Sequence, residues 1–160
     1  MEVEMRIRGL MMDPINNMPI VILKEATGNA ILPIWVGVAE ANAIALEIEK
    51  VVTPRPMTHD LLKNVLLGLD THVRKVVVTA IRDETFYAVI WIDRNGELIS
   101  VDSRPSDALA LALRIDCPIL VEDEVLRNSR SQPGTPDRIT NEDLKRWIDF
   151  NDEDLGKYKM

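Results

Sequence analysis

The sequence predicts an α+β protein in which helices cover a mainly antiparallel sheet built from two similar β-β-α halves. Apolar and charged residues alternate in several segments, as they do in half-buried strands. Two turn sequences, Thr27-Gly28-Asn29 and Asn95-Gly96, each join a pair of such segments into a hairpin. The same order of strands, turn and helix then occurs twice, which indicates an internal duplication.

The first half is predicted from the amino terminus to about residue 50. Residues 2–12 alternate apolar with charged side chains, and residues 19–25 and 30–36 are rich in β-branched residues, so all three segments are expected to be strands. A helix is expected over residues 38–50, because its apolar residues recur at helical spacing: Ala41, Ile44, Ala45 and Ile48.

The second half repeats this order. Strands are expected over residues 72–82, 85–93 and 97–101, followed by a helix over 105–115. Residues 42–46 match residues 107–111 at an offset of 65, which aligns the two predicted helices. We therefore expect residues 18–50 to superpose on residues 84–115.

The remaining segments connect or extend these halves. Thr53-Pro54-Arg55-Pro56 is a stiff connection that leads into a helix predicted over residues 59–69. A short strand is expected over 118–121, with a helical turn over 122–126. Residues 1–127 form the predicted core domain, and residues 128–160 a linker followed by an amphipathic helix that begins near Thr140.

Composition limits the class of protein. The net charge of −7 argues against a general nucleic-acid-coating protein, although an enzyme that binds phosphate at one local site remains compatible with it. A single cysteine, Cys117, suits a reducing compartment and is expected to be inert. Neither a signal peptide nor a membrane helix is present in the sequence, so we expect a cytoplasmic protein. Strand edges and apolar segments favour a homodimer.

Polar residues gather at the start of the helix predicted over 59–69. Thr58 is a suitable N-cap and Asp60 suits the first turn, so capping accounts for both residues. Arg55 and His59 have no such structural task. Judged on this segment alone, the bland interpretation is favoured: His59 has no function and is a solvated side chain on an exposed first turn.

A second polar segment precedes the helix predicted over 105–115. Pro105 is expected at the first helical position, which makes Arg104 the N-cap and places Asp107 where it can accept the Arg104 N–H. Capping does not explain Asp102, Arg104 and Ser106 together. The helix behind them is apolar on every face and therefore expected to be buried, so its polar first turn should border a cleft.

The chemistry of these side chains favours an anion and a cation at one site. A helix start and an arginine bind phosphate, while paired carboxylates can hold Mg²⁺ or Mn²⁺. Glu40 occupies the matching helix start in the first half and would add one carboxylate. Two histidines and one cysteine make structural zinc improbable, and no phosphate-binding glycine loop is present. The aromatic residues fall on predicted strands, where core packing is the default.

Three blocks together resemble the bifunctional nuclease family: residues 33–41 (PIWVGVAEA), 55–60 (RPMTHD) and 102–108 (DSRPSDA). The resemblance covers roughly residues 1–127. It implies an α+β fold and a nuclease activity on both DNA and RNA, but it carries no residue roles, which rest on side-chain chemistry. The alternative is a non-catalytic binding or regulatory module for an anionic ligand or a protein partner.

Residue roles follow from that chemistry as expectations. Asp102, Asp107 and Glu40 would hold the divalent ion, with His59 as acid or base, since histidine ordinarily titrates near neutral pH. Phosphate would bind Arg55, Arg104 and Ser106. In the structural alternative, Asp102 and Arg104 form an ion pair that braces two helix starts.

Overall fold

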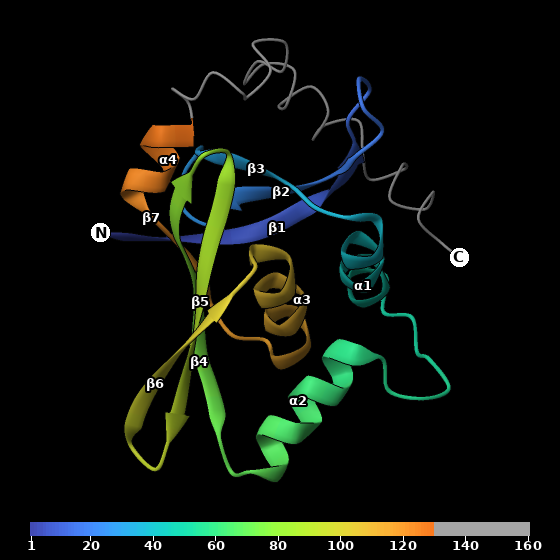
Figure 1. Ribbon diagram of the computed structural model, residues 1–160, viewed down its shortest axis with the longest axis vertical. Coiled ribbons are helices and arrows are strands. Elements are labelled where there is room, and N and C mark those ends of the chain that lie inside the picture. The colour runs from blue at the N-terminus through green and yellow to red at the C-terminus, as the bar shows by residue number, and fades with distance from the viewer. Residues whose placement is uncertain (130–160) are drawn as a thin grey trace.

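A computed structural model describes residues 1–129 and shows a seven-stranded mixed sheet with helices packed against it (Figure 1). The strand order is β3-β2-β1-β7-β4-β5-β6. Neighbouring strands are antiparallel except for β4 and β7, which are parallel. The predicted α+β class and the mainly antiparallel sheet are confirmed.

The first half is a three-stranded meander followed by a helix. Its elements are β1 (Glu2–Met12), β2 (Pro19–Glu25), β3 (Ile31–Trp35) and α1 (Val38–Ile48). β2 lies in the interior of this half and is buried on both faces at its start, as its apolar run predicts. A register shift near Gly9 marks a bulge where β1 pairs with β2.

The second half has the same order of elements: β4 (His72–Arg82), β5 (Thr85–Arg94), β6 (Glu97–Ser103) and α3 (Pro105–Ile115). Asn95 and Gly96 both adopt positive φ, 52° and 86°, which is the backbone of a tight two-residue hairpin and suits these two residues. β6 is the edge strand, and nearly all of it is exposed.

Each half is therefore β-β-β-α rather than the predicted β-β-α, because the first strand of each meander pairs with the hairpin that follows it. The internal duplication stays a prediction. The parallel pair was not expected. It arises because β7 (Ile119–Glu122) follows α3 and enters the sheet between the two meanders, beside β1 and β4.

Two further helices complete the described chain: α2 (Thr58–Gly68) and α4 (Asp123–Ser129). The predicted C-terminal helix near Thr140 lies outside the described residues. No helix within residues 1–129 combines the length and apolar character that crossing a bilayer would require.

The core lies between the sheet and α3, as the apolar character of this helix predicts. Residues 108–112 are all buried, with Leu109 and Leu111 fully enclosed. Burying a leucine side chain stabilises the fold by about 1.5–3 kcal/mol, so α3 is firmly anchored. α3 also packs against both α1 and α2 (Figure 1), and this packing brings the starts of all three helices together.

Candidate functional site

Four charged or polar side chains from three helices form one chain of hydrogen bonds. Arg104 Nη1 donates to Glu40 Oε1 at 2.9 Å, and Arg104 Nε donates to Asp107 Oδ2 at 2.9 Å. The other oxygen of the same carboxylate, Asp107 Oδ1, lies 3.0 Å from His59 Nε2. The chain therefore joins α1, α3 and α2 in the order Glu40, Arg104, Asp107, His59, and we call these residues the charged cluster.

Local structure places Arg104 and Asp107 on one side of the start of α3. Arg104 is the N-cap with extended backbone (φ −69°, ψ 144°), and Pro105 occupies the first turn, both as predicted. The predicted capping bond from Asp107 to the Arg104 N–H is wrong. No side chain caps α3, because both oxygens of Asp107 are engaged by the side chains of Arg104 and His59.

Glu40 reaches the cluster from the first turn of α1. The N-cap of this helix is Gly37, where an added Cβ would collide with Glu40 Oε2. Glycine therefore allows the Glu40 side chain to fold over the helix start while its other oxygen binds Arg104. Glu40 is partly enclosed, with 22% of its side chain exposed.

His59 is positioned by the first turn of α2. The predicted N-cap, Thr58, is wrong by one residue: Met57 is the N-cap, and its N–H donates to Asp60 Oδ2 at 2.9 Å. Only 12% of the His59 side chain is exposed. His59 is therefore not the solvated side chain of the bland interpretation, because it is largely enclosed and hydrogen-bonded to Asp107.

A second ion pair, buried on its arginine side, holds α2 on α3, and sequence reasoning missed it. Arg114 Nε donates to Asp60 Oδ1 at 2.8 Å, and only 3% of the Arg114 side chain is exposed. The other guanidinium nitrogens donate to the carbonyls of Ala110 and Ala43. One signal was available: a charged residue in the last turn of a buried helix requires partners.

The charged cluster shifts proton affinities within it. Partial burial acts to raise the pKa of the Asp107 carboxyl, but hydrogen bonds from Arg104 and His59 outweigh burial and lower the pKa of Asp107 below its ordinary value. The hydrogen bond to Asp107 comes first among the causes that raise the pKa of Arg104. Asp107 is therefore ionised, and Arg104 is charged, throughout the neutral range.

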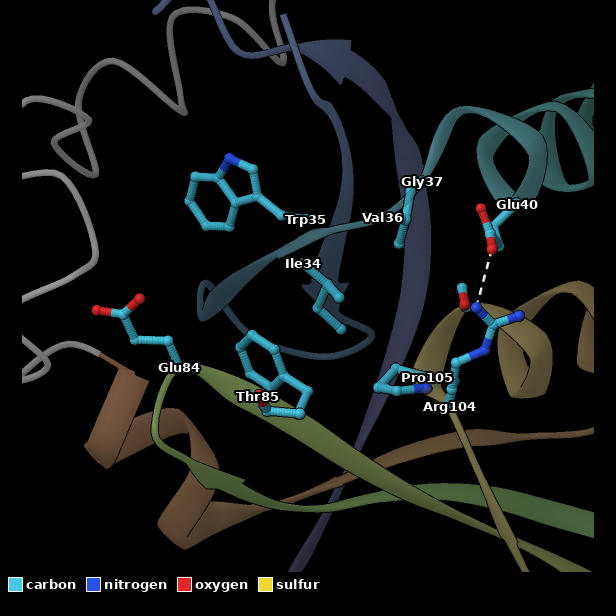
Figure 2. Close-up of a pocket in the computed structure, with 11 residues that line it drawn as sticks. Ile34, Trp35, Val36, Gly37, Glu40, Glu84, Thr85, Arg104 and Pro105 are labelled. Atoms are coloured by element: carbon cyan, nitrogen blue, oxygen red, sulfur yellow. Dashed lines mark hydrogen bonds and ion pairs between the residues drawn. The ribbon is translucent and has the colours of Figure 1, made fainter. Parts of the chain in front are cut away.

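Two cavities open beside the cluster. One has a volume of about 280 Å³ and is bordered by β3, β5 and the start of α3; the other, of about 350 Å³, lies between α1 and α2. Arg104 and Glu40 line both cavities, while His59 and Asp107 line the second. Figure 2 shows Arg104 and Glu40 joined at the rim of the first cavity.

The structure separates the predicted site residues into two groups. Glu40, His59, Arg104 and Asp107 form the charged cluster, and Ser106 lines the first cavity. Two predicted residues, Arg55 and Asp102, line neither cavity. Arg55 is exposed in the loop before α2.

Asp102 lies away from the cluster because of strand alternation. Its neighbour Val101 pairs with the core residue Ile90, whereas Asp102 pairs with Val89. Directly paired residues share a face of the sheet, so Asp102 belongs to the face opposite the core that holds α3. The structural alternative, an Asp102–Arg104 pair, is not formed, because Arg104 binds Glu40 and Asp107.

The donor set does not form a ready metal cage. Within residues 1–129, no three His, Cys, Asp or Glu side chains are arranged to hold a metal ion. In addition, Arg104 already binds the carboxylates of Glu40 and Asp107. The cluster is therefore not a pre-formed metal site within residues 1–129.

Cys117 contributes no nucleophile to the site. Burial raises the pKa of its thiol to about 11, so the reactive thiolate is scarce at neutral pH. Its side chain packs against the edge of the core. These observations agree with the predicted inert cysteine.

By fold and site, the chain is an α+β protein with a charged cluster where three helices meet, set between two cavities. Comparison with known proteins then identifies the family. Residues 21–133 match the bifunctional nuclease domain, and the chain belongs to the bifunctional nuclease family. The resemblance carried by the three sequence blocks is thereby confirmed.

Individual relatives differ in how much of their length is shared. An uncharacterized protein of Mycobacterium tuberculosis strain H37Rv is 44% identical over 123 residues, which are 77% of this chain and 73% of that protein. Bifunctional nuclease 1 of Arabidopsis thaliana is 31% identical over 107 residues, 64% of this chain and 33% of that protein. Bifunctional nuclease 1 of Oryza sativa subsp. japonica is 27% identical over 113 residues, which are 69% of this chain and 34% of that protein. The chain thus matches about a third of each plant protein.

Proposed function

We propose that the chain is a nuclease that hydrolyses phosphodiester bonds in DNA and RNA at the charged cluster. Membership of the bifunctional nuclease family and the similarity to plant proteins of that name support the proposal. The observation that carries it is the hydrogen-bonded chain from Glu40 to His59, which places a guanidinium and an oriented imidazole beside open cavities.

Arg104 is the proposed phosphate ligand. Its Nε and Nη1 bind carboxylates, and no partner for its Nη2 occurs in the part of the chain that the structure describes. The side chain is 64% exposed, so the free edge of the guanidinium can meet a phosphate oxygen from solvent. Glu40 and Asp107 hold the guanidinium in place, which reduces the entropy lost on binding.

His59 is the proposed base. Because Asp107 is ionised, its Oδ1 accepts a hydrogen bond, so His59 Nε2 carries the proton. The neutral imidazole then has its lone pair on Nδ1, which can take a proton from the attacking water. Asp107 fixes the tautomer and stabilises the imidazolium that forms, as carboxylates do in other histidine-dependent hydrolases.

Assistance by Mg²⁺ or Mn²⁺ stays part of the proposal. Magnesium in phosphoryl-transfer enzymes is usually held by one or two carboxylates, water and substrate phosphate rather than by a protein cage. Glu40 is the carboxylate with an oxygen available for this role, because its Oε2 has no hydrogen-bond partner within residues 1–129, whereas both oxygens of Asp107 are engaged. Bound there, an ion would neutralise charge on the scissile phosphate.

The proposal is tested by cleavage of single- and double-stranded DNA and RNA with highly purified protein, with and without Mg²⁺ or Mn²⁺. His59→Gln should lower the rate by about 10²–10⁴-fold, the usual contribution of a positioned acid or base. His72→Gln is the matched control, because His72 is the second of the two histidines and is exposed on β4.

Equal rates for wild type and both variants would indicate a co-purifying nuclease and overturn the proposal. Phosphate binding without any cleavage would instead favour the alternative function, a binding module for an anionic ligand.

A further inference from the structure

The 280 Å³ cavity combines an apolar wall with a polar rim. Ile34, Val36, Phe86 and Pro105 supply the apolar wall. Ile34 and Val36 are almost fully buried behind it, and Phe86 packs against the edge of the core. The rim includes Arg104, and Figure 2 shows Ile34, Pro105 and Arg104 around the same open space. Such a combination is typical of small-molecule sites, in which apolar walls bind and a few polar groups orient.

Ser106 provides a second, independent observation. It is 5% exposed and lines this cavity, yet none of the residues from 1 to 129 supplies a hydrogen-bond partner for its hydroxyl. The hydroxyl oxygen is not among the fully enclosed atoms that lack a partner, so it opens to the cavity, where a ligand oxygen can form a hydrogen bond with it. Ser106 also belongs to the first turn of α3, whose N–H groups and dipole favour an anion.

Arg104 links this cavity to the proposed cleavage site. Its guanidinium lines the 280 Å³ cavity together with Ser106, and it lines the 350 Å³ cavity together with His59 and Asp107. A phosphate at Arg104 therefore has the apolar cavity on one side and His59, the proposed proton acceptor, on the other. The sugar attached to that phosphate can direct its nucleobase into the 280 Å³ cavity.

We propose that the 280 Å³ cavity is a nucleobase subsite, which holds the base of the nucleotide whose phosphate binds Arg104 and Ser106. This inference rests on the proposed nuclease function and adds to it the class of substrate. A base can enter the cavity only after leaving a base stack, so the substrate is single-stranded or contains an unpaired nucleotide.

The charge of the chain agrees with this substrate class. A net charge of −7 gives no broad basic surface to follow a duplex backbone. Glu84 on the cavity rim also repels additional phosphates. Binding by a local phosphate contact plus burial of one base does not need a basic surface, and stacking on an aromatic side chain contributes to it.

Calorimetric titration of the whole chain tests the subsite with adenosine monophosphate, ribose 5-phosphate and inorganic phosphate. Adenosine monophosphate should bind at least about tenfold more tightly than ribose 5-phosphate, because the base adds its own contact. Phe86→Leu should remove most of this difference. Tyr87→Leu is the matched control: Tyr87 is the next aromatic residue of β5 and alternates to the other face.

Ser106→Ala gives a reading that does not depend on how the core tolerates a change at Phe86. This variant should lower the affinity for adenosine monophosphate and for ribose 5-phosphate by a similar factor, since both compounds contain the phosphate. Equal affinity of wild type for the two compounds, or equal effects of Phe86→Leu and Tyr87→Leu in variants that melt like wild type, would overturn the nucleobase subsite. If the wild-type chain bound none of the three phosphate compounds, the proposed function itself would be contradicted.

Discussion

His59 Nε2 lies 3.0 Å from Asp107 Oδ1, although 48 residues separate the two in the chain. The contact exists because the first turn of α2 packs along α3. The next residue of α2, Asp60, binds Arg114 two turns further along α3. Two adjacent residues of α2 are thus fixed by two residues of α3, and the first of these contacts orients the imidazole that we propose as the base.

The Asp60–Arg114 pair predicts how firmly α2 is held. Asp60→Ala would leave the enclosed Arg114 guanidinium without its carboxylate and would also remove the hydrogen bond to the Met57 N–H. We expect the free energy of unfolding to fall by about 1–3 kcal/mol, measured by urea denaturation. Asn64→Ala, at an exposed position of the same helix, should have little effect. A wild-type urea midpoint for Asp60→Ala would show that the pair contributes nothing to stability.

The lowered pKa values of Asp60 and Asp107 predict how the free energy of unfolding changes in acid. The pKa of Asp60 is lowered first by the Met57 N–H and then by Arg114, and that of Asp107 by Arg104 and His59 against the effect of burial. Both lie below the ordinary value of 3.8, which the unfolded chain regains. The unfolded chain therefore binds more protons in acid.

It follows that the stabilisation by these two carboxylates is complete above the unfolded pKa and is lost as the pH falls through the lowered folded pKa. In urea unfolding experiments between about pH 6 and about pH 2, the free energy of unfolding should fall more steeply for wild type than for the Asp60→Asn, Asp107→Asn double variant. Parallel curves for the two proteins would refute the linkage.

The expected homodimer also becomes a specific proposal. None of the residues of α2 is buried, and it exposes large apolar side chains that include Leu61 (57%) and Val65 (47%). We propose that α2 of one copy packs against α2 of a second, since a two-fold axis would bring these apolar side chains of both copies together and cover them.

Light scattering at micromolar concentration should give a dimer mass for wild type. Leu61→Glu should shift the chain towards a monomer, whereas Val52→Glu, in the exposed loop before α2, should not. A monomer mass for wild type would rule the dimer out.

Local sequence patterns predicted most of the fold because strands, turns and helices depend on near neighbours. The bounds of β1, β2, β4 and α3 agree with the predicted ranges. Pairing between distant segments leaves no such pattern. The insertion of β7 between the meanders, with its parallel pairing to β4, therefore could not be predicted.

Local patterns also pointed to members of the charged cluster. Arg104 was singled out because capping does not explain it together with Asp102 and Ser106, and Glu40 because it occupies the matching helix start in the first half. His59 was expected at the same site as Asp107, but their direct contact depends on helix packing and was not expected. The predicted strand ended at residue 101, so its alternation did not extend to Asp102, which β6 places on the face opposite Val101.

Asp107 and Asp102 provide the most direct test of the charged cluster as the catalytic site. The two residues have the same side chain and lie in one sequence block, but only Asp107 contacts Arg104 and His59. Single-turnover cleavage of a single-stranded oligonucleotide should fall by about 10²–10⁴-fold in Asp107→Asn and stay near wild type in Asp102→Asn. Full activity of Asp107→Asn together with loss of activity in a folded Asp102→Asn would contradict the account.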